Sequence, residues 1–156
     1  MTCIFRGLTA SALVLTSAFT AFAQDSGPTL NDISTGADTK AIFDKMAGEK
    51  EIPAWVKGGA TTFPTHEVTF GGKTYSVYTG CEKDNCGDNV FAVAYNADDK
   101  VMYGLAVSAT EESDDEVLTW YNIGGGPESI DGKTVLYAAT TGSLENHPDA
   151  FNYPQK

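Results

Sequence analysis

Hydrophobic and polar residues alternate over two short runs near the middle of the chain, 68–70 and 74–78. Alternation with a period of two is typical of a β-strand, whose successive side chains point to opposite faces. Gly71 and Gly72 separate the two runs, and a Gly-Gly pair suits the positive φ angles of a tight two-residue turn. The pattern therefore predicts a β-hairpin.

Three further strand-like runs follow at 89–95, 101–109 and 117–123. A short polar segment, 96–100, separates the first two and is expected to be a turn. The acidic run 111–116 separates the last two, and we expect it to be a solvated loop. Successive strands joined by short connections predict a meandering antiparallel sheet.

Helices are expected on either side of these strands in the sequence, which gives an α+β fold class. Asp38 or Thr39 can cap a helix that runs to residue 50, with its apolar residues on one face. Residues 129–141 contain β-branched side chains, so helix and strand both remain open, and the length of the segment favours a helix. Residues 24–36 are polar and are expected to be irregular.

The first 23 residues have the features of a secretory signal peptide. Arg6 is the only charged side chain before Asp25, an apolar stretch covers 8–22, and residues 21–23 have the A-x-A form that signal peptidase cleaves. A transmembrane helix needs roughly 20 mainly apolar residues, and this stretch is shorter and diluted by Ser and Thr. We expect cleavage after residue 23, export, and a single domain over 24–156 with no membrane span.

The chain is strongly acidic, with 21 Asp and Glu against 10 Lys and Arg and a formal charge of −11. Loss of Arg6 with the signal peptide would leave nine basic side chains against the same 21 acidic ones, a charge of −12. Nucleic acids bind through Lys and Arg contacts to phosphate, so neither they nor anionic membranes are expected as partners. The charge either keeps an exported protein soluble or speeds encounter with a cationic protein.

Cysteine spacing points to a disulfide. Cys3 would leave with the signal peptide, which leaves Cys81 and Cys86 in a C-x4-C spacing. An even pair in an exported protein implies a disulfide. Four intervening residues do not fit the C-x2-C redox motif, and no second pair is present to complete a zinc site.

Catalytic and metal chemistry have little support in the sequence. The two histidines, His66 and His147, lie in no hydrolase motif; His66 is expected at the surface and His147 in a turn, with a structural hydrogen bond. The acidic run 111–116 lacks the alternation and central Gly of an EF-hand loop. No cofactor, metal or enzymatic activity is therefore expected.

The remaining candidate is the polar loop Glu82, Lys83, Asp84 and Asn85 between the two cysteines. A bridged loop loses little conformational entropy on docking, which is an advantage for a loop that inserts into a cleft. A stapled hairpin with no partner explains the same residues, so from the loop alone both interpretations stay open.

Several strings across nearly the whole chain after the signal peptide resemble the inhibitor of vertebrate lysozyme family, exported proteins of Gram-negative bacteria. They are 39–41, 53–56, 57–59, the C-x4-C-G loop at 81–87, 118–120, 129–136 and the distinctive T-G-S-L-E-N-H-P-D at 141–149. The resemblance implies a central antiparallel sheet flanked by helices, an α/β/α-type sandwich often paired as a homodimer. It also implies a periplasmic location and inhibition of lysozyme by the bridged loop.

In characterised members of that family the loop reads C-K-P-H-D-C, and its His enters the lysozyme cleft to meet the catalytic carboxylates. The present chain has Lys83 in place of the Pro, Asp84 in place of the His and Asn85 in place of the Asp. An ionised carboxylate only accepts hydrogen bonds, and it repels other carboxylates. Binding then requires that Lys83 supply a cation, or that Asp84 be protonated by the lysozyme acid beside it.

Three functional hypotheses of different classes follow. The first is a periplasmic inhibitor of c-type lysozyme, or of a related muramidase or lytic transglycosylase that cleaves peptidoglycan, which occludes the active-site cleft with the bridged loop. The second is a diverged, non-inhibitory binding protein of the cell envelope with the same fold, because Asp84 replaces the loop His. The third is an enzyme, for which the sequence supplies no nucleophile–base pair. We expect the first.

Overall fold

The computed structural model describes residues 27–110, 113–126 and 128–153, and the expected signal peptide, 1–23, lies outside them. The strands of the described residues form one six-stranded antiparallel sheet in the order β1-β3-β4-β5-β6, with β2 also paired to β3. The strands are β1 Ala60–Thr62, β2 His66–Phe70, β3 Lys73–Glu82, β4 Asn89–Asn96, β5 Val101–Thr110 and β6 Ser113–Tyr121. The predicted hairpin is confirmed, because β2 and β3 pair around Gly71 and Gly72, which both have positive φ.

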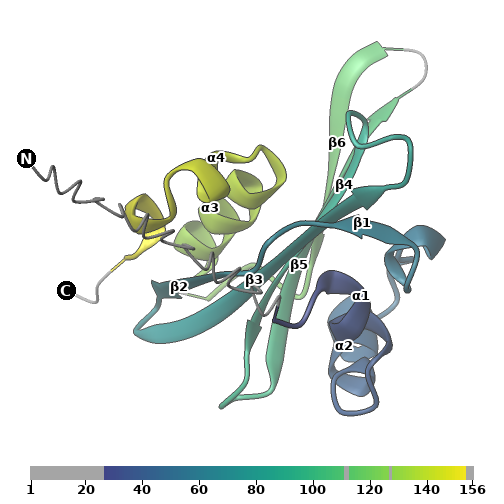
Figure 1. Ribbon diagram of the computed structural model, residues 1–156. Coiled ribbons are helices and arrows are strands. Elements are labelled where there is room, and N and C mark those ends of the chain that lie inside the picture. The colour runs from purple at the N-terminus through teal and green to yellow at the C-terminus, as the bar shows by residue number, and fades with distance from the viewer. Residues whose placement is uncertain (1–26, 111–112, 127, 154–156) are drawn as a thin grey trace, which may run out of the picture.

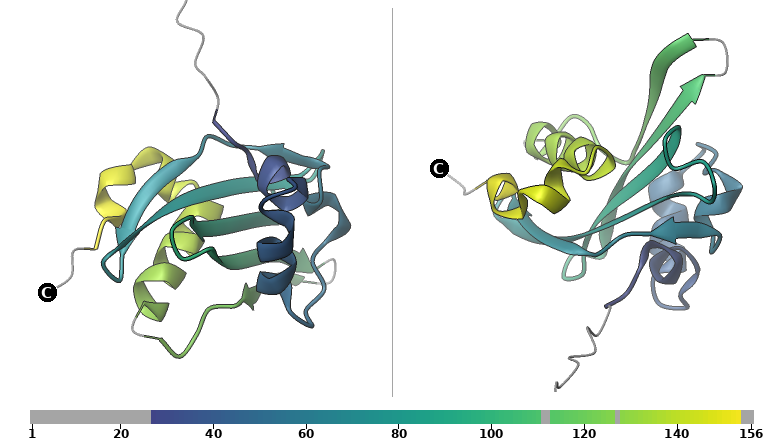
Figure 2. Two further views of the ribbon diagram at one scale, coloured as in Figure 1. Left: turned by 90° about the horizontal axis from the view of Figure 1, so that it is seen from below. Right: turned by 45° about the horizontal axis from the view of Figure 1, so that its top comes forward.

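Helices cover both faces of this sheet (Figure 1). One face carries α1 Leu30–Thr35, α2 Lys40–Ala47 and the short 3-10 turn η1 Ala54–Val56. The other carries α3 Ser129–Thr140, α4 Ser143–Asn146 and the 3-10 turn η2 Pro148–Phe151. Figure 2 shows the same separation from two further directions. The expected α+β class, with a central antiparallel sheet flanked by helices, is confirmed.

Two hydrophobic cores lie on the two faces of the sheet, and β4 contributes to both. Its Phe91 and Val93 pack with α1 and α2, whereas Ala92 and Ala94 pack beneath α3 and α4. All four side chains are fully buried. Successive side chains of a strand point to opposite faces, so β4 presents larger residues to α1 and α2 and small ones to α3 and α4.

The expectation that residues 24–36 are irregular is wrong in part. Residues 30–35 form α1, which Thr29 and Asp32 begin with a reciprocal capping box. The Thr29 hydroxyl and backbone N–H both donate to Asp32, and they hold the pKa of that carboxyl below its usual value. Leu30 and Ile33 are buried against the sheet, so tertiary packing stabilises a helix of only six residues.

The acidic run 111–116 was also predicted wrongly in part, since β6 begins at Ser113. Glu116 pairs with Ala109 across the hairpin, and the register shifts between Ala109 and Thr110. The β5–β6 hairpin therefore extends as a two-stranded arm beyond the rest of the sheet (Figure 1). Asp115 and Glu116 are exposed on this arm, so their charges remain in contact with water.

The last segment is a helix, as its length suggested, and the chain after it is more ordered than a turn. Helix α3 ends at Thr140, and α4 and η2 follow. The tail then binds the edge of β2: the Thr69 N–H donates to the Asn152 side chain at 2.8 Å, and the Tyr153 N–H donates to the Thr69 carbonyl at 2.6 Å. These bonds hold the tail that follows η2 against β2. Among the described residues, no helix combines the length and the apolar character that crossing a bilayer demands.

Candidate functional site

The connection between β3 and β4 carries the predicted disulfide. Cys81, the penultimate residue of β3, is bonded to Cys86 in the loop, with 4.8 Å between their Cα atoms. Cys81 is fully buried and Cys86 is exposed. The bond therefore ties an exposed loop to a buried position in the sheet.

The tip of this loop is a hydrogen-bonded turn over residues 82–85. The Asn85 N–H donates to the Glu82 carbonyl at 3.0 Å, and Asp84 has a φ of +65°. A four-residue turn with positive φ at its third residue alone has type II geometry. Asp is one of the few side chains other than Gly that adopt this conformation readily. The backbone therefore fixes Asp84 at the outer corner of the loop.

The four predicted site residues divide into two pairs. The Glu82 carboxylate accepts from the Asn85 side-chain amide at 3.3 Å and from that of Asn89 at 2.7 Å, and all three residues are half-buried. Lys83 and Asp84, by contrast, are exposed. Glu82 and Asn85 thus hold the loop in shape, and Lys83 and Asp84 are the side chains that it presents.

The base of the loop is also bonded to the neighbouring strand. The Asn89 N–H donates to the Asn85 carbonyl at 3.1 Å, and the Ala109 N–H donates to the Asp88 carbonyl at 2.8 Å. This second bond joins the loop to β5 at the point where the β5–β6 arm leaves the sheet. The loop is therefore anchored on three sides: by its disulfide, by the Glu82 carboxylate and by β5.

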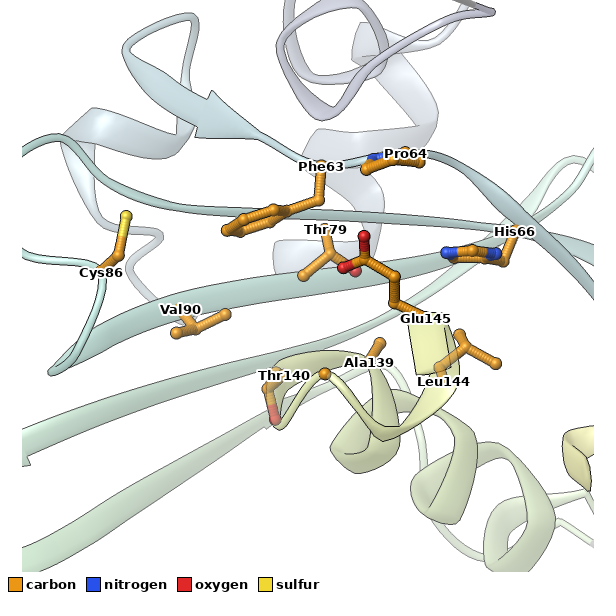
Figure 3. Close-up of a pocket in the computed structure, with 11 residues that line it drawn as sticks. Phe63, Pro64, His66, Thr79, Cys86, Val90, Ala139, Thr140, Leu144 and Glu145 are labelled. Atoms are coloured by element: carbon orange, nitrogen blue, oxygen red, sulfur yellow. The ribbon is translucent and has the colours of Figure 1, made fainter. Parts of the chain in front are cut away.

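A pocket of about 100 Å³ lies behind the loop, between the sheet and the helices α3 and α4. Cys86 forms part of its wall, with Phe63, Thr79 and Val90 from the strand side and Leu144 and Glu145 from α4. Figure 3 shows the Glu145 carboxylate pointing towards the strands, between Thr79 and His66. Sequence analysis missed this pocket because its walls come from segments as far apart as residues 63 and 145, and no local pattern connects them.

The two histidines have different environments. His147 is exposed, and its backbone links α4 to η2: its N–H donates to Ser143 and its carbonyl accepts from Ala150. His66 was expected at the surface, but its Nε2 is buried at the pocket and has no hydrogen-bond partner among the residues that the structure describes. Within those residues, no group of three or more His, Cys, Asp or Glu side chains is placed to hold a metal ion.

Comparison with known proteins identifies the family of this chain. The family model described as "Inhibitor of vertebrate lysozyme (Ivy)" matches residues 38–141, which include the whole bridged loop. The chain belongs to this family. Its relatives include the inhibitor of vertebrate lysozyme of Escherichia coli (strain K12), which is 43% identical over 150 residues, 96% of this chain and 94% of that protein. An uncharacterized protein of Yersinia pestis is 30% identical over 131 residues, 80% of this chain and 81% of its own.

A further relative is the inhibitor of vertebrate lysozyme of Pseudomonas aeruginosa, 32% identical over 75 residues, which are 47% of this chain and 49% of that protein.

The loop of this Ivy-family chain presents one cation and one anion, Lys83 and Asp84, at its corner. Such a tip can donate from the ammonium and accept at the carboxylate.

Proposed function

We propose that this protein inhibits a lysozyme or related muramidase by placing the bridged loop 81–86 in the active-site cleft of the enzyme. The observation that carries the proposal is the rigid, outward-pointing corner formed by Lys83 and Asp84 in a chain of the Ivy family. A preorganised loop binds with a small loss of conformational entropy, because its shape does not change on docking. The relatives from E. coli and P. aeruginosa are named as inhibitors of vertebrate lysozyme.

The chemistry of the tip determines how tightly such a loop binds. Glycoside hydrolases of the lysozyme type use two carboxyl groups in the cleft, one of them protonated. Ionised Asp84 repels the charged one, but it accepts a hydrogen bond from the protonated one. Lys83, one residue away, offers an ammonium to the ionised carboxylate. We infer that this chain recognises the acid pair with a Lys–Asp tip instead of a single His.

The same tip suits a lytic transglycosylase. These enzymes use one catalytic acid, so Asp84 meets less like-charge repulsion there than in a two-carboxylate cleft. Peptidoglycan-cleaving enzymes of the cell envelope are the targets that an exported protein encounters, and the expected signal peptide, 1–23, would deliver this chain to the periplasm. The negative formal charge would speed encounter with a basic muramidase. Pairing as a homodimer is also proposed, on the family resemblance.

Titration of the protein against c-type lysozyme and a lytic transglycosylase tests this function, with Asp84→His run in parallel. We expect the wild-type protein to inhibit, and Asp84→His to inhibit lysozyme more tightly by roughly 30-fold or more, since a buried charge contact is worth about 2–5 kcal/mol. His tolerates positive φ as Asp does, so the exchange leaves the turn intact.

Asp88→His is the matched control. Asp88 is an exposed carboxylate in the same loop, but it lies at the base beside β5 and away from the corner. It should leave inhibition unchanged. Absence of binding to every muramidase in the panel at micromolar concentration would contradict inhibition as the function. Equal effects of Asp84→His and Asp88→His would show that the corner does not enter the cleft.

A second candidate is a non-inhibitory binding protein of the envelope with the same fold. Asp84 favours it, since an acceptor-only side chain replaces the donor that the family resemblance associates with the cleft. Capture of a defined partner other than a muramidase from periplasm, together with no inhibition by the wild-type protein, would select this function.

A further inference from the structure

The pocket behind the loop, described above, has a composition that points to a ligand class. We propose that it receives an arginine or lysine side chain of the muramidase that the loop engages, as a second contact point of the inhibitor. The inference rests on the proposed function, because it names part of the surface of the same partner. It assigns to Glu145, His66 and Phe63 a role in recognition.

The walls of the pocket suit the aliphatic stem of a long basic side chain. Phe63 lines the pocket with 37% of its surface exposed, and Val90 and Leu144 add further apolar wall. Lys and Arg side chains bury their methylene groups against such surfaces while the charged head remains with polar groups. A pocket of about 100 Å³ is large enough for a single extended side chain and too small for a folded element.

The polar groups of the pocket accept hydrogen bonds from a cation. The Glu145 carboxylate points over the space between Thr79 and His66 (Figure 3). Buried polar atoms nearly always have a hydrogen-bond partner, yet the buried Nε2 of His66 has none among the described residues. In the neutral tautomer with the proton on Nδ1, this nitrogen is an acceptor. A guanidinium has five N–H donors, so one head group can serve both the carboxylate and the imidazole.

The pocket lies beside the bridged loop, so a protein that binds the loop is positioned to supply the basic side chain. Cys86 belongs to the bridged loop and also to the pocket wall, and Val90 lies in β4 just after the loop. A protein that covers the loop on the α4 side therefore also covers the mouth of the pocket. The negative charge of the chain selects a basic surface for that protein, and the Glu145 carboxylate rejects an acidic side chain.

Binding of the full protein to lysozyme, measured by calorimetry, tests the inference with two isosteric variants. Glu145→Gln removes the carboxylate charge at the pocket, and Glu49→Gln removes the same charge from an exposed residue after α2, on the other face of the sheet. We expect Glu145→Gln to weaken binding by roughly 5-fold and Glu49→Gln to leave it unchanged. Ala139→Leu, which fills the pocket from α3, should also weaken binding while the melting temperature shows that the variant is folded.

A titration with n-butylguanidinium separates failure of this inference from failure of the proposed function. We expect it to shift the Nε2 ¹⁵N resonance of His66, and the shift to be lost in Glu145→Gln. Equal lysozyme affinities of Glu145→Gln and Glu49→Gln would overturn the pocket contact and leave inhibition by the loop intact. If the wild-type protein binds no muramidase, the proposed function fails, and absence of a His66 shift then overturns the ligand class as well.

Discussion

Asp84 combines a left-handed backbone conformation with exposure at the corner of the bridged loop. Its positive φ places it at the third position of a type II turn, where most side chains are strained. Residue types and cysteine spacing were enough to predict the Cys81–Cys86 disulfide and to single out 82–85 as the candidate loop. Within this loop Glu82 and Asn85 are half-buried, and Lys83 and Asp84 are exposed. This difference depends on the hydrogen bonds that the Glu82 carboxylate accepts from Asn85 and Asn89, which no local pattern reveals.

Lys83→Pro should stabilise the protein. Lys83 is the second residue of the turn, the position at which type II turns favour Pro, and the substitution restricts the unfolded chain. We expect the free energy of unfolding to rise by about 0.5 kcal/mol relative to Lys83→Ala, measured from urea midpoints at constant m-value. A lower midpoint for Lys83→Pro than for Lys83→Ala would mean that the turn does not have this geometry.

At the level of elements, the strands were easier to predict than the helices that cover them. Alternation and the Gly71-Gly72 turn defined the β2–β3 hairpin from the sequence alone. Helix α1 was missed because its six residues are too few for a helical period, and its burial depends on the sheet. The arm β5–β6 was shortened in the prediction because its acidic side chains are typical of a loop, although exposed strands also tolerate them.

Reduction of the Cys81–Cys86 disulfide should destabilise the β3–β4 hairpin and weaken inhibition. The bond closes a six-residue loop, and its loss returns about 2 kcal/mol of chain entropy to the unfolded state. Urea unfolding with and without a reductant measures the stability change. Inhibition should fall further than stability, because the free loop must then order on binding. Equal inhibition by the reduced and oxidised proteins would contradict a preorganised loop.

At the level of the whole molecule, burial in the two cores changes the pKa of four tyrosine hydroxyls. Burial raises the pKa of the Tyr75, Tyr78, Tyr103 and Tyr121 hydroxyls above their usual value. The Tyr121 hydroxyl also donates to the Glu51 carbonyl at 2.8 Å. The folded state therefore favours the neutral form of each ring, which an alkaline solution opposes.

Alkaline pH should consequently unfold the protein. The folded pKa values lie above the unfolded value of about 10, so the contribution of these tyrosines is complete below pH 10 and is lost as pH rises through the folded values. Urea midpoints should be flat between about pH 8 and 9.5 and fall above pH 10. Tyr121→Phe should reduce the steepness of this fall. An unchanged slope would show that ionisation of Tyr121 is not linked to folding.

The placement of β4 between two cores has a consequence for how the chain unfolds. Phe91 and Val93 pack in the core under α1 and α2, and Ala92 and Ala94 pack in the core under α3 and α4. Because both cores pack on the same strand, disruption of one core also disrupts the packing of the other. Melting of the N-terminal helices and of the C-terminal helices should coincide in one all-or-none transition. The bridged loop begins on β3 and ends on β4, so the two strands that carry it separate only when both cores unfold.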